Sequence, residues 1–128
     1  MASGQRPRVL VVDDDLAIRT TFADILSGEG YDVTAAPDGS EAMRLAGGQP
    51  FDVVLLDLFM PGMDGLTVLP LLRALAPATS VVIVSAFVEP DRAAEAFRLG
   101  AAAVLVKPPN VDELLACFRG LTARGVAE

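Results

Sequence analysis

The chain has 128 residues, 52% of them hydrophobic and 21% charged, which is typical of one folded domain rather than a disordered segment. Its net charge of −7 argues against binding to nucleic-acid phosphates or to an anionic membrane. Histidine is absent and Cys117 is the only cysteine, so histidine triads, histidine zinc sites and an internal disulfide are excluded. No apolar segment predicts a signal peptide or a membrane span, and a lone cysteine suits the cytoplasm, which is the expected location.

The hydrophobic pattern predicts strands that alternate with helices along the chain. The expected strands are short apolar runs at 8–13, 31–36, 53–57, 80–85 and 102–106. The expected helices run from 14 or 15 to about 27, and over 40–46, 66–75, 89–99 and 110–121. Gly47-Gly48 is expected to close the second helix, and Pro70 is tolerated if the third helix begins near residue 66, but otherwise predicts a kink.

Short connections with right-handed crossovers then predict an α/β fold, a doubly wound five-stranded parallel sheet with helices on both faces. The domain is expected to span 8–122, with 1–7 as a flexible lead-in and 123–128 as a frayed tail. The third helix is expected to carry Leu66, Leu69, Leu72 and Leu75 on one face.

Functional groups follow four of the predicted strands: Asp13-Asp14, Asp57, Ser85 and Lys107. The carboxyl ends of parallel strands meet at one edge of the sheet, so these four distant stretches are expected to converge there. Two carboxylates about 4 Å apart repel by roughly 4 kcal/mol at an effective dielectric near 20. Such a cluster predicts a raised pKa or a bound cation, and oxygen ligands suit Mg²⁺.

The same groups suit phosphoryl transfer, in which Asp57 would be the nucleophile and form an acyl phosphate. Asp13 and Asp14 would hold Mg²⁺, while Ser85 and Lys107 would donate hydrogen bonds. Lys107 is the only lysine among ten basic residues, and we expect it to pair with Asp57. Each group alone has an ordinary explanation at a strand exit or helix start, and only their convergence favours a site. The other nearby acids are interpreted structurally, as a solvated first-turn residue (Asp15) and as turn residues (Asp38, Asp64).

Four segments resemble, in order, the motifs of receiver domains from bacterial two-component response regulators: Val-Leu-Val-Val-Asp-Asp-Asp, Asp-Leu-Phe-Met-Pro-Gly-Met-Asp-Gly, Val-Ser-Ala and Val-Lys-Pro-Pro. The resemblance covers residues 8–121 and implies a flavodoxin-like sheet with strand order 2-1-3-4-5. It also implies that Asp57 is phosphorylated by a partner histidine kinase or histidine phosphotransfer protein. The chain would then be a signalling phosphoacceptor rather than an enzyme, with only self-directed phosphotransfer and dephosphorylation.

The resemblance further implies that Asp14 binds Mg²⁺ directly, that Asp13 binds it largely through water, and that the backbone carbonyl of Phe59 completes the protein ligands. It implies phosphoryl contacts from the Ser85 hydroxyl, the Ala86 N–H and the Lys107 ammonium. It makes the Lys107–Pro108 bond a candidate cis peptide. The fourth helix, fifth strand and fifth helix would form the switching surface and could also pair two copies in a homodimer.

Three residues bear on how such a receiver would switch. Val104 stands where many receivers carry Tyr or Phe, and a valine cannot swing inward as that ring does, which calls the usual coupling to the hydroxyl into question. Phe59 and Phe87 are bulky residues beside the expected phosphoryl group. We hypothesise that they limit water access and tune the lifetime of the acyl phosphate.

Two other functions remain alternatives. One is a degenerate receiver that binds proteins without being phosphorylated. The other is a haloacid dehalogenase-type phosphatase, which is disfavoured because Ala17 stands where Thr or Val is expected and no later Gly-Asp-Gly motif occurs. The sequence does not decide the cognate kinase, the output, or whether the chain is a whole regulator or one domain of a longer protein.

Overall fold

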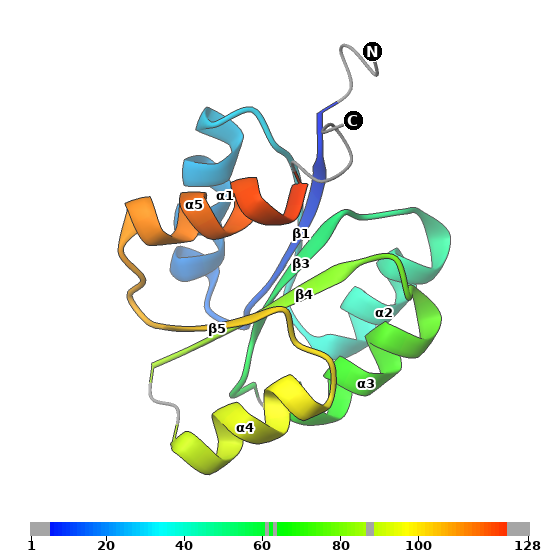
Figure 1. Cartoon of the computed structure of the whole chain (residues 1–128). Helices are drawn as coiled ribbons and strands as arrows, with labels where there is room; N and C mark the ends of the chain where they lie inside the picture. The colour runs from blue at the N-terminus through cyan, green and yellow to red at the C-terminus, as the bar shows by residue number, and fades with distance from the viewer. Residues whose placement is uncertain (1–5, 61, 63, 87–88, 123–128) are drawn as a thin grey trace.

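The structure, a computed structural model, describes residues 6–60, 62, 64–86 and 89–122. These residues form strands and helices in strict alternation, as the hydrophobic pattern predicts (Figure 1). In chain order the elements are β1 (Arg8–Val12), α1 (Leu16–Gly28), β2 (Asp32–Ala36), α2 (Gly39–Gly48), β3 (Val53–Asp57), α3 (Gly65–Leu75), β4 (Ser80–Ser85), α4 (Pro90–Arg98), β5 (Ala103–Val106) and α5 (Val111–Thr122). None of the helices in this part of the chain is long and apolar enough to cross a membrane.

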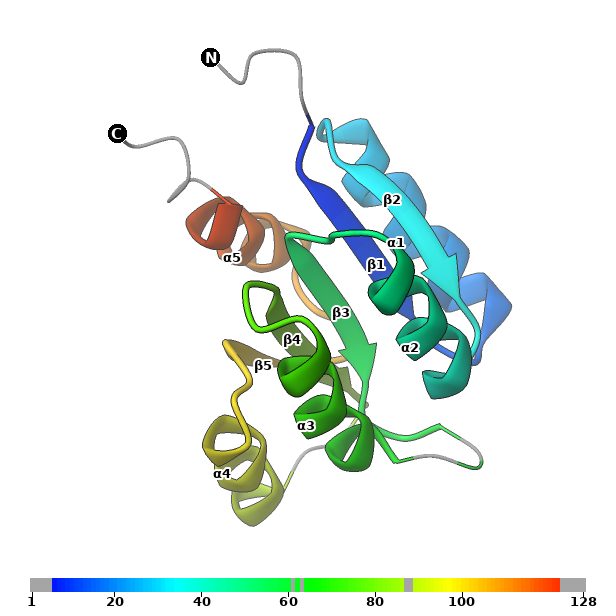
Figure 2. The same ribbon diagram turned by 90° about the vertical axis from the view of Figure 1, so that its right-hand side faces the viewer.

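The five strands form one parallel sheet in the order β2-β1-β3-β4-β5, so the predicted fold class and strand order are confirmed. Helices α1 and α5 cover one face, and α2, α3 and α4 cover the other (Figure 2). β3 is the central strand, and all five of its residues are buried. Its register sets Asp57 opposite Val84 of β4. The phosphoacceptor candidate is therefore held by paired backbone on a strand that cannot shift without disturbing both faces of the sheet.

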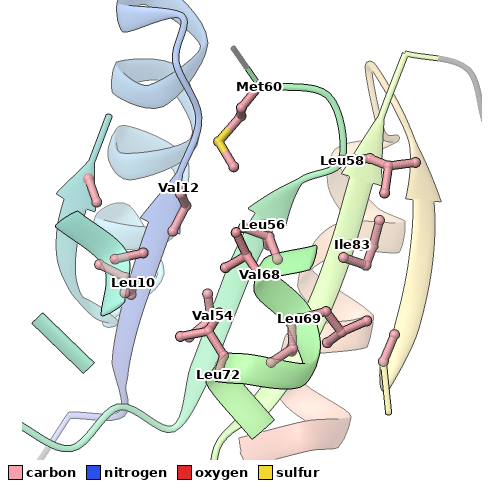
Figure 3. Close-up of a cluster of buried hydrophobic side chains, with 14 of the residues drawn as sticks. Leu10, Val12, Val54, Leu56, Leu58, Met60, Val68, Leu69, Leu72 and Ile83 are labelled. Carbon is pink, nitrogen blue, oxygen red and sulfur yellow. The ribbon is translucent and has the colours of Figure 1, made fainter. Parts of the chain in front are cut away.

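Two cores form because successive side chains of a strand point to opposite faces. Val9 and Val11 join the core under α1 and α5, whereas Leu10 and Val12 join the core under α2, α3 and α4. Figure 3 shows the second of these cores, in which strand side chains meet those of α3. Full burial of each such side chain contributes roughly 1.5–3 kcal/mol. The two cores together fix the sheet edge on which the functional groups lie.

Aspartates cap three of the helices at their N-termini. The side chains of Asp15, Asp38 and Asp64 accept hydrogen bonds from backbone N–H groups one turn or less ahead, at 3.1, 2.8 and 2.9 Å. Asp15 is therefore a cap rather than a first-turn acid, which corrects the sequence interpretation. Such caps each stabilise a helix by about 0.5–2 kcal/mol, so these three acids have structural roles. The sequence pattern alone does not tell a capping aspartate from one that only faces solvent.

Two helix details differ from expectation. Helix α2 continues through Gly47-Gly48, because these glycines keep negative φ angles and the N–H of Gln49 still bonds to the Leu45 carbonyl at 3.1 Å. Leu75 is 45% exposed, and α3 instead buries Gly65, Val68, Leu69 and Leu72. Repeated steps of three residues drift around a helix of 3.6 residues per turn, so four leucines at that spacing cannot share one face. Pro70 lies inside α3, which continues past it to its last residue.

Candidate functional site

Three aspartates gather where β1 and β3 end side by side. Oxygens of Asp13, Asp14 and Asp57 all lie within 4.8 Å of one another, one from each carboxylate. Asp13 and Asp57 are buried, at 1% and 4% exposure, whereas Asp14 is exposed. Parallel pairing of β1 with β3 produces this arrangement, because it brings the ends of both strands to one edge. The cluster therefore has two buried carboxylates beneath one that faces solvent.

Lys107 reaches the same cluster from the end of β5. Its Nζ lies 2.7 Å from Asp13 Oδ2 and 3.4 Å from Asp57 Oδ1, so its principal partner is Asp13. The sequence predicted pairing with Asp57, which is the longer of the two contacts. The backbone N–H of Lys107 donates to the Ser85 carbonyl at 2.7 Å, which fixes the point from which the side chain extends. Burial alone would lower the pKa of Lys107, but the bonds and charges of both aspartates outweigh it and raise the pKa.

Asp57 is difficult to ionise in this setting. Burial and, next, the negative charge of Asp13 raise the pKa of Asp57 to about 6. The ammonium of Lys107 and the backbone N–H of Phe59, which lies 3.4 Å from Asp57 Oδ1, oppose that increase only in part. The raised pKa follows the repulsion predicted from the sequence, with burial as the larger cause. At neutral pH the carboxylate is mostly ionised and held at an energetic cost.

Backbone contacts fix the orientation of Asp13. Its Oδ1 accepts a hydrogen bond from the Asp15 N–H at 2.9 Å, and its carbonyl accepts one from Arg19 Nη1 of α1 at 2.7 Å. With Lys107 on Oδ2, both oxygens of the buried Asp13 carboxylate have partners. The sequence offered no signal for the role of Arg19, because its partner is a main-chain oxygen.

β4 brings the predicted hydroxyl to the edge beside Asp57. Ser85 is the last residue of β4, is fully buried, and follows Val84, the register partner of Asp57. Ala86 comes next and is exposed. Phe87, the second of the proposed tuning residues, lies outside the described residues. The Lys107–Pro108 peptide bond, singled out by the resemblance, is cis.

Phe59 and Val104, the other two residues expected to affect switching, occupy different environments. Phe59 is 51% exposed, and the guanidinium carbon of Arg92 lies 5.2 Å from the centre of its ring. Val104 is partly buried and packs against the core beneath α2, α3 and α4. Its register partner is Ile83 of β4. Phe59 thus lies at the surface beside the cluster, whereas the Val104 side chain packs β5 against the hydrophobic core.

Two further features of the site were missed from the sequence. Arg92 of α4 forms an ion pair with Asp64, 28 residues earlier, at 3.1 Å. Gly65 has no room for a side chain, because an added Cβ would lie 2.7 Å from the Asp57 carbonyl oxygen and 2.8 Å from the Leu58 Cα. The first turn of α3 therefore abuts the backbone of the central strand. No local pattern in the sequence links Arg92 to Asp64 or reveals the close approach at Gly65.

The donor set fits a hard divalent cation. Among the described residues, three carboxylates face one ammonium, so the cluster keeps negative charge. All the side-chain donors are oxygens, and the exposed Asp14 leaves one side open to water, as Mg²⁺ prefers. These residues can therefore hold such an ion, and a cation among them would favour the ionised form of Asp57.

Comparison with known proteins agrees with the geometry. The model of the response regulator receiver domain family matches residues 9–119. The transcriptional regulatory protein ZraR of Escherichia coli K12 is 41% identical over 108 residues, which cover 84% of this chain and 24% of ZraR. The chain spans about a quarter of the length of the curated relatives it matches.

Solved structures give the same result. The receiver domain of the Francisella response regulator 1452 has a TM-score of 0.87 and 35% identity, over 94% of this chain and 99% of that one. A response regulator from Burkholderia pseudomallei, with a phosphorylated aspartic acid, a calcium ion and citrate, has a TM-score of 0.84 and 30% identity, over 94% of this chain and 71% of that one.

Proposed function

The chain belongs to the response regulator receiver domain family, and we propose that Asp57 is its phosphoacceptor. The observation that carries the proposal is the buried carboxylate at the end of the central strand, with two further acids and an ammonium around it. A partner histidine kinase or histidine phosphotransfer protein is the proposed phosphohistidine donor, and the family to which the chain belongs supports this assignment.

In the forward step an oxygen of Asp57 attacks phosphorus, the O–P bond forms, and the P–N bond to the partner's imidazole breaks. The imidazole leaves as the neutral base after taking up a proton. The signal ends by hydrolysis of the acyl phosphate: water attacks phosphorus, the O–P bond to Asp57 breaks, and inorganic phosphate leaves. Attack needs the ionised carboxylate, which a pKa of about 6 leaves available at neutral pH.

Asp13, Asp14 and Asp57, with the backbone carbonyl of Phe59, are the proposed ligands of Mg²⁺. When bound, Mg²⁺ neutralises charge on the oxygens of the transferring phosphoryl group. The Burkholderia relative, described with a phosphorylated aspartic acid and a calcium ion, supports pairing a phosphoaspartate with a divalent cation in this fold. Asp13 keeps its orientation through the N–H of Asp15 and the guanidinium of Arg19.

Lys107, Ser85 and Ala86 are the proposed phosphoryl contacts. The ammonium of Lys107 already lies 3.4 Å from Asp57 Oδ1 and would pair with a phosphoryl oxygen there. Ser85 stands one residue beyond the register partner of Asp57, which supports a contact from its hydroxyl at the same edge. The Ala86 N–H follows directly. Formation of these contacts would draw the ends of β4 and β5 toward the phosphoryl group.

The proposed output is a change in the surface formed by α4, β5 and α5. Phe97 of α4 and Val106 of β5 are 52% and 55% exposed on these elements, which supports contact with a partner or a second copy. Val104 packs in the core, so its coupling to Ser85 would pass through β5 itself rather than through a swinging ring. The presence of Phe59 beside the cluster supports a role in limiting water access to the acyl phosphate.

An apolar pocket of about 530 Å³ lies beside the site, between α1 and the segment after β5. Ile18, Phe22 and Ile25 line it from α1, and Lys107, Pro108 and Val111 line it from the other side. A phosphohistidine must approach Asp57 within bonding distance, and this pocket supports engagement of its donor protein next to the acids.

The test is incubation with a small acyl-phosphate donor, with and without Mg²⁺, followed by intact-mass analysis. Wild type should gain one phosphoryl group only with Mg²⁺, and Asp57→Asn should gain none. Absence of any adduct, with Mg²⁺ binding intact, would favour the degenerate receiver. Continuous consumption of the donor without an adduct would instead revive the phosphatase alternative.

A further inference from the structure

We propose that Arg92 is a positioning residue for the phosphoryl site, which it controls by holding the loop between β3 and α3 against α4. The inference rests on the proposed function, because it assigns Arg92 to the affinity for Mg²⁺ and to the lifetime of the phosphoryl group on Asp57. We call Arg92, Asp64 and Phe59 the Arg92 clamp.

Arg92 contacts a residue near each end of this loop, Phe59 after β3 and Asp64 before α3. Its Nη2 lies 3.2 and 3.1 Å from the two carboxylate oxygens of Asp64, just before α3. Its guanidinium also lies over the ring of Phe59, two residues after Asp57, at 5.2 Å. One side chain of α4 thus joins the first and last parts of the loop. The planar guanidinium is suited to this double contact, because its edge pairs with a carboxylate while its face stacks on a ring.

Both ends of the loop lie close to Asp57. The N–H of Phe59 lies 3.4 Å from Asp57 Oδ1, a long hydrogen bond that small shifts of the loop would make or break. At the other end, the N–H of Gly65 donates to the Leu58 carbonyl at 2.7 Å, and α3 abuts the carbonyl of Asp57. The loop also carries the Phe59 carbonyl, the proposed backbone ligand. The Arg92 clamp therefore sets the position of a donor and of a ligand at the site.

The contacts of the Arg92 clamp are individually modest. The Arg92 and Asp64 side chains are 31% and 44% exposed, so solvent screens their ion pair. Arg92 Nε is buried with no hydrogen-bond partner among the described residues, which further weakens the clamp. α4 belongs to the proposed output surface, so the clamp also joins the phosphoryl site to that surface.

Charge and positioning predict opposite effects of removing Arg92. If Arg92 acted only as a nearby positive charge, Arg92→Ala would bind Mg²⁺ more tightly, because a repulsive cation is lost. If Arg92 positions the loop, the same variant should bind Mg²⁺ about threefold to tenfold more weakly. Its phosphoryl group should also be lost about threefold faster, because the Phe59 ring is no longer held beside the cluster by the Arg92 guanidinium. The sign of the change in Mg²⁺ affinity separates the two explanations.

The experiment measures the Mg²⁺ dissociation constant by calorimetric titration and the decay of the phosphorylated form by intact mass. Arg98→Ala is the matched control, because Arg98 lies on the same helix and pairs within it, with Glu95. It should stay within about twofold of wild type in both measurements. Arg92→Lys should recover Mg²⁺ affinity only in part, since an ammonium keeps the charge but loses the stacked plane.

A combination with Phe59→Leu completes the test. Changes caused by Arg92→Ala and Phe59→Leu should be less than additive, because both remove the same contact. Unchanged or tighter Mg²⁺ binding in Arg92→Ala would overturn the inference, as would an equal effect of Arg98→Ala. If wild type takes no phosphoryl group, the proposed function fails, while the Mg²⁺ titrations still decide whether the clamp positions the loop.

Discussion

Charged residues lie at both ends of the parallel strands, which we call the amino edge and the carboxyl edge of the sheet. The two edges differ in how far their charges are buried and neutralised. At the amino edge, Arg8 contacts the ring of Phe51, the Gln49 side chain and, at 3.8 Å, Asp32. The Asp52 carboxylate accepts the Arg8 N–H at 2.8 Å. The Arg8 and Asp32 side chains are 35% and 59% exposed, so solvent screens their ion pair, although Arg8 Nε itself is buried with no hydrogen-bond partner among the described residues. The amino edge therefore keeps most of its charge in contact with solvent.

At the carboxyl edge the charges are buried and unequal. Asp13 and Asp57 are almost fully covered and share one ammonium, while Asp14 adds a third carboxylate. The pKa of Asp57 rises to about 6 because burial and Asp13 oppose its ionisation. The contrast between the two edges indicates that charged residues at a strand end become a candidate site when they are buried and their charges are not neutralised by neighbours. A cation or a covalent group can then relieve the imbalance.

The largest test of this comparison removes the buried ammonium. Lys107→Met keeps an apolar stem but leaves the buried Asp13 carboxylate without its ammonium partner, so the free energy of unfolding should fall by about 3–5 kcal/mol. Chemical denaturation at neutral pH measures the loss, and added Mg²⁺ should restore part of it. Arg44→Met is the control, because Arg44 pairs with Glu41 on the surface of α2, where solvent screens the pair, so its loss should change the free energy of unfolding far less than Lys107→Met does.

The second test removes a charge that the fold disfavours. The pKa of Asp57 in the folded state, about 6, lies above its ordinary value of 3.8, so the folded protein binds the proton more tightly than the unfolded chain. The stability of wild type should therefore decrease as pH rises from about 4 to about 6 and stay low above that window. Asp57→Asn lacks this titration, so without Mg²⁺ it should be more stable above pH 6 by on the order of 3 kcal/mol.

Urea unfolding of both proteins across that pH range isolates the effect, because the other acids titrate in both. The advantage of Asp57→Asn should vanish near pH 4, where Asp57 is protonated. A difference that is constant with pH would mean that the carboxylate is not strained by its surroundings, and the contrast between the two edges would lose its basis.

Much of the fold follows from local pattern. Apolar runs that end in turn residues specify the strands, and parallel pairing then brings Asp13, Asp57, Ser85 and Lys107 to one edge. The approximate site is predictable for this reason, since it depends only on which residue ends each strand. Its charge balance is also predictable, because the residue types alone place three acids against one lysine.

The finer arrangement depends on packing that the pattern does not contain. The choice of Asp13 over Asp57 as the main partner of Lys107 rests on a difference between 2.7 and 3.4 Å. The ion pair of Arg92 with Asp64 joins residues 28 positions apart on elements packed together only in the folded chain. The exposure of Leu75 follows from helix geometry, because steps of three residues drift around a helix of 3.6 residues per turn. Side-chain partners thus require the tertiary structure, whereas strand ends do not.

The smallest expected effect concerns the amino edge itself. Asp32→Asn removes one carboxylate from the Arg8 contact while keeping the side-chain shape, and the exposed pair at 3.8 Å should be worth about 0–1 kcal/mol. The free energy of unfolding should change by no more than that, and the change should shrink further in high salt, because screening already weakens the pair. Denaturation of wild type and variant at low and high ionic strength gives both quantities. A loss comparable to that of Lys107→Met would contradict the comparison, because it would mean that the two edges store charge in the same way.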